Sequence, residues 1–155
     1  MKTIKLIIVT LLVSVVSVAM AQKKITVNDV YNGKTVLQFA KEHAVEAFNA
    51  TKAIYKPGMS EEAFVNACFV NFPPKYIDLR DILMPYASFL YKMHVNGLTD
   101  DQVRQQTTGK EFVDTSNGLM TWKQAHPDEI VERLPWWRTT IHWIAIFFTW
   151  LDNTL

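Results

Sequence analysis

The C-terminal segment constrains the fold of this chain more than any other part of the sequence. Residues 135–155 read PWWRTTIHWIAIFFTWLDNTL and contain four of the five tryptophans. Wound as a helix, the segment is apolar over most of its circumference. A narrow stripe of polar or small side chains remains, formed by Arg138, His142, Ala145, Thr149 and Asp152. Such a rod can cross a membrane, fill a protein core or contact a partner.

The length of the apolar run argues against a membrane span. Thirteen residues separate Arg138 from Asp152, and one of them is His142. At a rise of about 1.5 Å per residue they reach roughly 20 Å, whereas the hydrocarbon core is about 30 Å thick. A span would therefore have to draw a charged side chain into the bilayer. We expect no transmembrane span in the mature chain, which leaves peripheral contact with a membrane open.

Core packing and partner binding are compatible uses of the same helix. One face gathers Trp136, Trp143, Phe147 and Trp150, and an adjoining face gathers Trp137, Ile141, Ile144, Phe148 and Leu151. Burying a large aromatic side chain contributes roughly 1.5–3 kcal/mol, so one face suits the core. Tryptophan and arginine also dominate binding hot spots. We therefore take the entrance of the helix and its polar stripe as the candidate partner site: Trp136, Trp137, Arg138 and His142.

The rest of the chain has the periodicity of helices joined by short loops. Apolar residues recur at intervals of three and four, glycine is scarce, and prolines fall between the periodic stretches. The pattern predicts helices over residues 35–55, 60–72, 81–96, 99–108 and 111–125, with a short helix starting at Pro127. Alternation typical of a strand is confined to a few residues near 25–27. The predicted fold is all-α, a single compact bundle of five or six helices.

Helix starts are marked by capping residues. Ser60 precedes two glutamates, and Thr99 is followed three residues later by Gln102, which forms a capping box. Asp81 could cap the next helix, with Pro85 in its first turn. Gly109 is expected to end the helix that begins at Thr99.

The N-terminus has the pattern of a cleaved secretory signal. Lys2 and Lys5 precede a short apolar run that ends in Ala19-Met20-Ala21. Cleavage after Ala21 gives a signal peptide of residues 1–21 and a single helical domain of residues 22–155, although an uncleaved anchor is the alternative. We expect a periplasmic or secreted protein.

Charge and cysteine content exclude several classes of protein. Removing Lys2 and Lys5 leaves fourteen basic residues against fifteen acidic ones. A near-neutral chain has no basic face for nucleic acid. Cys68 is the only cysteine, so no intramolecular disulfide can form, and its apolar neighbours indicate a buried side chain. The domain must therefore be stabilised by its core.

Candidate chemistry is sparse. Glu42, His43 and Glu46, with His94 from another helix, could form a metal site, but residues that no motif links do not specify one. Carboxylates for glycan cleavage could come from Asp78 with Asp81, or from Glu111 with Asp114, at separations that a sequence cannot show. We expect no catalytic residues, no metal and no cofactor.

These features favour an exported, non-enzymatic protein that binds another protein or an envelope component. A periplasmic inhibitor and a toxin-immunity protein share this profile, as an analogy of class alone. Two alternatives remain: a carrier of a hydrophobic small ligand, and an envelope hydrolase acting on glycan or peptide bonds.

Overall fold

The computed structural model describes residues 24–128, 143–144, 147 and 149–150. The predicted signal peptide, residues 1–21, lies outside these ranges. The described chain is mostly helical, as predicted, with five α-helices, one 3-10 turn and a small β-hairpin. In chain order the elements are β1 (Val30–Tyr31), β2 (Lys34–Thr35), α2 (Val36–Thr51), α3 (Glu61–Cys68), η1 (Pro74–Tyr76), α4 (Ile77–Val95), α5 (Asp100–Gln106) and α6 (Lys110–Ala125).

Two helices begin at the caps that the sequence predicts, and a third begins at a cap that the sequence analysis does not name. Ser60 accepts a hydrogen bond from the backbone N–H of Ala63 and caps α3. Thr99 caps α5 in a capping box with Gln102. Thr35 and Gln38 form a second capping box at the start of α2, so this helix begins where its apolar periodicity begins. Side-chain oxygens thus satisfy backbone donors at all three helix starts.

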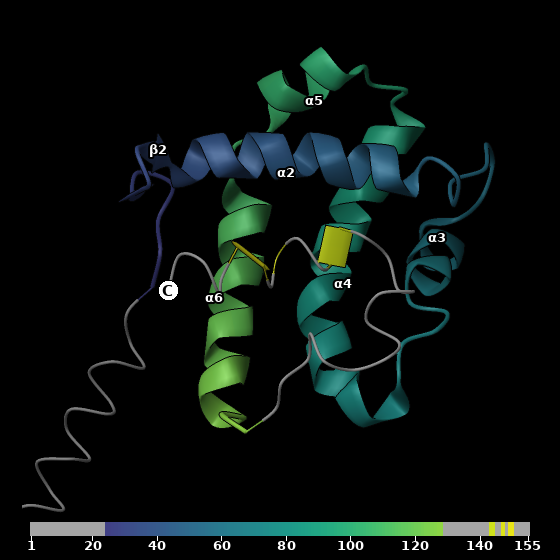
Figure 1. Ribbon diagram of the computed structural model, residues 1–155. Helices are drawn as coiled ribbons and strands as arrows, with labels where there is room; N and C mark the ends of the chain where they lie inside the picture. Colours follow the sequence, from purple (N-terminus) through teal and green to yellow (C-terminus); the bar gives the residue numbers. More distant parts are fainter. Residues whose placement is uncertain (1–23, 129–142, 145–146, 148, 151–155) are drawn as a thin grey trace, which may run out of the picture.

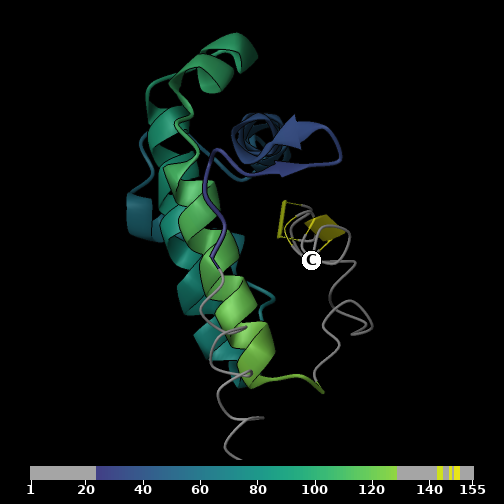
Figure 2. The same cartoon turned by 90° about the vertical axis from the view of Figure 1, so that its left-hand side faces the viewer.

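The helices form two layers. The antiparallel helices α4 and α6 pack side by side, and α3 lies against α4 (Figure 1). Helix α2 crosses this pair near one end, with α5 beyond it. Figure 2 shows the described C-terminal residues on the same side of the α4–α6 pair as α2. The core therefore lies between the pair and a second layer made of α2 and the described C-terminal residues.

Helix α4 begins four residues before the predicted start at Asp81, with Pro85 in its interior. Tyr76 and Leu79 are buried, and the ring of Tyr76 packs edge-on against Trp122 of α6 at 6.2 Å. This packing holds the turns that precede the proline. Pro85 and Asp81 are both exposed, so the carbonyl that loses its intrahelical bond can be hydrated. Tertiary packing thus extends the helix through a position where proline usually marks its start.

The hairpin departs from the all-α prediction. Val30 pairs with Thr35 and Tyr31 pairs with Lys34 across a two-residue turn. The turn is Asn32-Gly33, with φ angles of 51° and 78°. Two positive φ angles define the turn that Asn-Gly favours in tight hairpins. This dipeptide was the local signal for the hairpin, whereas the alternation noted near residues 25–27 precedes it.

Gly118 allows α4 and α6 to approach closely. A β-carbon at this position would lie 2.8 Å from Cγ2 of Ile82, inside van der Waals contact. A glycine in the middle of a helix costs up to about 1 kcal/mol relative to alanine. The close helix crossing explains why the sequence accepts that cost.

The core is apolar and aromatic, and it includes Cys68, which is 1% exposed. Burial raises the pKa of the Cys68 thiol to about 12, so the thiol stays protonated and behaves as a small hydrophobic group, as predicted. Among the described residues, no helix has the length and apolar character needed to cross a membrane.

Candidate functional site

The residues predicted to contact a partner, Trp136, Trp137, Arg138 and His142, lie outside the described residues. The structure does describe the part of the same segment that follows them. Trp143, Ile144, Phe147 and Trp150 are helical and buried, and Thr149 is helical and exposed. The division into an apolar face and a polar stripe thus holds for these five residues.

His43 of α2 links the two layers of the fold. It is 3% exposed, and both ring nitrogens form hydrogen bonds: Nδ1 with the Tyr86 hydroxyl at 2.8 Å and Nε2 with the Trp143 carbonyl at 3.1 Å. A carbonyl can only accept, so Nε2 carries the hydrogen. In the neutral ring, Nδ1 then accepts from the Tyr86 hydroxyl. Burial raises the pKa of Tyr86 well above its usual value, with a smaller effect of Glu111, and keeps this donor protonated.

Aromatic rings enclose His43. Its ring centroid lies 4.1 Å from Phe147, 5.0 Å from Tyr86 and 5.3 Å from Phe112. Trp143 in turn stacks on Tyr86, with centroids 5.4 Å apart. One hydrogen bond and several ring contacts therefore hold Trp143 and Phe147 against α2, α4 and α6.

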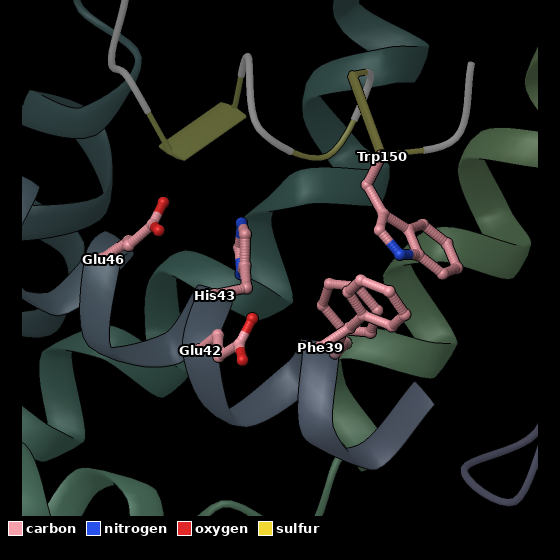
Figure 3. Close-up of a pocket in the computed structure, with 6 residues that line it drawn as sticks. Phe39, Glu42, His43, Glu46 and Trp150 are labelled. Carbon is pink, nitrogen blue, oxygen red and sulfur yellow. The ribbon is translucent and has the colours of Figure 1, made fainter. Parts of the chain in front are cut away.

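A small pocket opens beside this junction. It has a volume of about 80 Å³ and is lined by Phe39, Glu42, His43, Glu46, Phe112 and Trp150. Figure 3 shows Glu42 and Glu46 on successive turns of α2, with His43 between them and the rings of Phe39 and Trp150 beside them. The pocket thus combines an acidic rim with aromatic walls.

The two rim carboxylates are in different environments. Both are exposed, but Glu42 accepts hydrogen bonds from Nζ of Lys34 at 3.2 and 3.4 Å. The same Lys34 ammonium lies 5.8 Å from the ring centroid of Phe39. Like charges four residues apart on a helix repel by a few tenths of a kcal/mol. A cation at the rim relieves this repulsion, and Lys34 does so from the Glu42 side.

The wall formed by Trp150 contains an unsatisfied donor. Trp150 is 9% exposed, and its indole Nε1 is buried with no hydrogen-bond partner among the described residues. In Figure 3 the edge of the ring that carries this nitrogen faces the ring of Phe39, and the six-membered ring points away from His43. A buried N–H without an acceptor costs about 1–3 kcal/mol. Among the described residues, Nε1 of Trp143, Oγ of Ser116 and Nε of Arg80 are unsatisfied in the same way, and of these four groups only Nε1 of Trp150 belongs to a residue that lines the pocket.

The structure does not assemble the metal site that Glu42, His43, Glu46 and His94 could have formed. Both nitrogens of His43 are in hydrogen bonds, whereas His94 hydrogen bonds to Oγ1 of Thr51 at 2.7 Å. Within the described ranges, no three His, Cys, Asp or Glu side chains are placed to hold a metal ion.

The carboxylates considered for glycan cleavage are also not at the pocket. Asp114 forms an ion pair with Lys110 of its own helix at 2.6 Å. Asp78 lies in the first turn of α4, and Asp81 is exposed on the same helix. Glu111 lies in the first turn of α6 and is not part of the pocket lining.

His94 lies in a second aromatic cluster, and its environment predicts acid sensitivity. It is stacked between Phe48 at 4.3 Å and Tyr55 at 5.1 Å. The Thr51 hydroxyl donates to the Ala47 carbonyl and therefore accepts from His94 Nε2–H. Burial, with a smaller effect of Lys52, lowers the pKa of His94 from 6.5 to about 4.

Stability should therefore fall as the pH drops from about 6.5 to about 4. In this window the unfolded chain binds a proton at His94 and the folded chain does not, which favours unfolding. We expect a loss of about 2 kcal/mol, which is less than the full pKa difference gives, because nearby solvent screens the charge. Urea unfolding at pH 7 and pH 4.5 measures it. The variant His94→Gln should lose less unfolding free energy than the wild type when the pH is lowered. An equal loss in both proteins would contradict the role of His94 in acid sensitivity.

Sequence reasoning missed the pocket because its residues come from three distant segments. Sequence spacing places Glu42, His43 and Glu46 together on α2, but it does not predict that Phe112 and Trp150 lie beside them. The spacing of Phe39 and His43, four residues apart on one helix, was the available signal. Which aromatic residues would cover that face depends on tertiary packing.

Comparisons with protein-family models, curated proteins and solved structures find no match for this chain.

Proposed function

We propose that this chain is an exported, non-enzymatic binding protein. The observation that carries the proposal is the pocket beside α2, which combines an acidic rim with aromatic walls. One wall is Trp150, whose buried indole N–H has no hydrogen-bond partner among the described residues. Ligand sites typically combine apolar walls with a few polar groups that fix orientation. The signal-like residues 1–21 support export to the periplasm or beyond.

The partner in this proposal is another protein or an envelope component, as for an inhibitor or a toxin-immunity protein. The predicted partner residues Trp136, Trp137, Arg138 and His142 lie outside the described residues, and their part in binding remains a prediction. Neither a carrier of hydrophobic ligands nor a hydrolase has a specific observation in its favour among the described residues. The pocket is small and rimmed by carboxylates, which an apolar ligand would have to desolvate.

Affinity capture from the envelope extract of the source cells tests the proposal. The bait is the mature chain, residues 22–155, compared with the double variant Glu42→Gln/Glu46→Gln. Both substitutions are on an exposed surface, so folding should be preserved. We expect the wild-type chain to retain one component at a stoichiometric level and the double variant to retain much less.

Mass spectrometry of the full-length chain produced in the same cells tests export in parallel. Cleavage after Ala21 is the expected result. Equal capture by wild-type and double-variant baits, or full-length chain that remains in the cytoplasm, would contradict the proposal.

A further inference from the structure

We propose that the pocket beside α2 binds a primary ammonium group that has a hydrogen-bond acceptor within a few bonds of it. The amino-terminus of a peptide has this chemistry, because its carbonyl lies two bonds from the ammonium nitrogen. A small amino compound such as an amino-acid amide has it as well. The inference rests on the proposed binding function and names the chemical group that this site would recognise.

The acidic rim of the pocket is the reason to expect an ammonium group in the ligand. Glu42 and Glu46 are one helical turn apart at the mouth of the pocket (Figure 3). The ammonium of Lys34 pairs with Glu42 and lies over Phe39, so this rim already holds an alkylammonium group of the chain itself. Glu46 lies beyond that ion pair on the next turn. A ligand ammonium placed beside Glu46 gains a charge-assisted hydrogen bond and offsets the repulsion between the two carboxylates.

The indole N–H of Trp150 is the reason to expect a hydrogen-bond acceptor in the ligand. An ammonium ion alone leaves this donor unsatisfied, since it has no lone pair to offer. A carbonyl oxygen close to the ammonium could accept from Nε1 while the ammonium remains at the rim. The half-buried ring of Phe39 lies 5.9 Å from that of Trp150, and it would turn to admit the acceptor. In this proposal the carboxylates bind the ammonium end of one small polar group, and the indole N–H binds its carbonyl end.

The size and walls of the pocket limit the rest of the ligand. A water molecule needs about 10–15 Å³ on the same measure, so the pocket of about 80 Å³ holds a group of only a few heavy atoms. Phe39, Phe112 and Trp150 form aromatic walls against which a methyl group or a short alkyl group can pack. A bulky ring does not fit this volume.

Isothermal titration with three probes tests the inference. L-alanine amide has both the ammonium and the carbonyl, n-propylamine lacks the acceptor, and N-acetyl-L-alanine amide lacks the charge. We expect L-alanine amide to bind more tightly than n-propylamine by about fivefold or more, corresponding to one hydrogen bond. The acetylated probe should show no binding at concentrations on the order of 10 mM.

Three variants assign the contacts. Glu46→Gln should weaken the binding of L-alanine amide about tenfold or more, because a charge-assisted hydrogen bond is lost. Trp150→Phe keeps an aromatic wall but removes the N–H. The affinity for L-alanine amide should therefore fall to the affinity for n-propylamine. Lys34→Met removes the competing internal ammonium and should strengthen both amines. The matched control is Glu62→Gln on α3, an exposed carboxylate outside this pocket, which should change nothing.

Circular dichroism checks that each variant is folded, and Glu46→Gln remains informative if Trp150→Phe is unstable. Equal binding of the acetylated probe, absence of binding by L-alanine amide, or unchanged affinity in folded Glu46→Gln overturns the inference. Trialanine amide then separates the two sources of the group. Binding at least as tight as that of L-alanine amide indicates a peptide amino-terminus, and weaker binding indicates a small free compound.

Failure here is distinguishable from failure of the proposed function. If envelope capture depends on Glu42 and Glu46 while L-alanine amide does not bind, the ligand chemistry is wrong and the binding function stands. If L-alanine amide binds as expected but the chain is not exported and captures nothing, the pocket stands and the proposed function is wrong.

Discussion

Replacing Trp143 with alanine should lower the free energy of unfolding by about 4 kcal/mol. Trp143 is fully buried, stacks on Tyr86 and meets the ring of Phe69 edge-on at 6.3 Å. Removing the indole leaves a large cavity at the junction of α4 with the C-terminal segment, and the surrounding rings can fill it only partly. Urea unfolding of residues 22–155 at pH 7 and 25 °C measures the loss.

Val70→Ala is the control for this substitution. Val70 is 76% exposed, so its replacement should change stability by no more than about 0.5 kcal/mol. A loss below about 1 kcal/mol for Trp143→Ala, comparable to that of the control, would show that the segment is not part of the folded core.

Replacing His43 with leucine should cost about 3 kcal/mol although leucine is more hydrophobic. The substitution leaves the Tyr86 hydroxyl and the Trp143 carbonyl without their partner in a dry environment. Each unsatisfied buried group costs about 1–3 kcal/mol, which outweighs the gain in apolar surface. The change in unfolding free energy relative to wild type measures the effect.

A double-mutant cycle with Tyr86→Phe isolates the hydrogen bond within that cost. Tyr86→Phe alone removes one of the two hydrogen bonds and should cost about 1–2 kcal/mol. The double variant His43→Leu/Tyr86→Phe should be destabilised by less than the sum of the two single variants, because it no longer contains a hydroxyl that has lost its acceptor. Strict additivity would mean that the His43–Tyr86 bond contributes nothing.

The sequence predicted the fold best where the signals are local. Ser60 and Thr99 caps identify their helices because a side-chain oxygen reaches a backbone N–H only three residues away. The failures have tertiary causes. Pro85 is interior to α4 because packing of Tyr76 and Leu79 stabilises the turns before it. Asn32-Gly33 is the exception, a local hairpin signal that was overlooked.

The candidate site was predictable only in fragments. Glu42, His43 and Glu46 share one helix, so their proximity follows from sequence spacing alone. Trp150 lies more than one hundred residues away, and only packing of its helix on α2 brings its indole to them. The expected apolar face of that helix is buried at Trp143, Phe147 and Trp150. The predicted contacts at Trp136, Trp137, Arg138 and His142 lie outside the described residues and remain predictions.

The most direct test of the pocket as a binding site follows the indole signals during titration with L-alanine amide. A chain labelled with nitrogen-15 gives one indole N–H signal for each of its five tryptophans, and Trp150→Phe assigns that of Trp150. We predict that the Trp150 signal shifts in a saturable way as its N–H gains an acceptor, while the signal of Trp122, outside the pocket, stays in place. A Trp150 signal that does not move at saturating L-alanine amide would contradict the account.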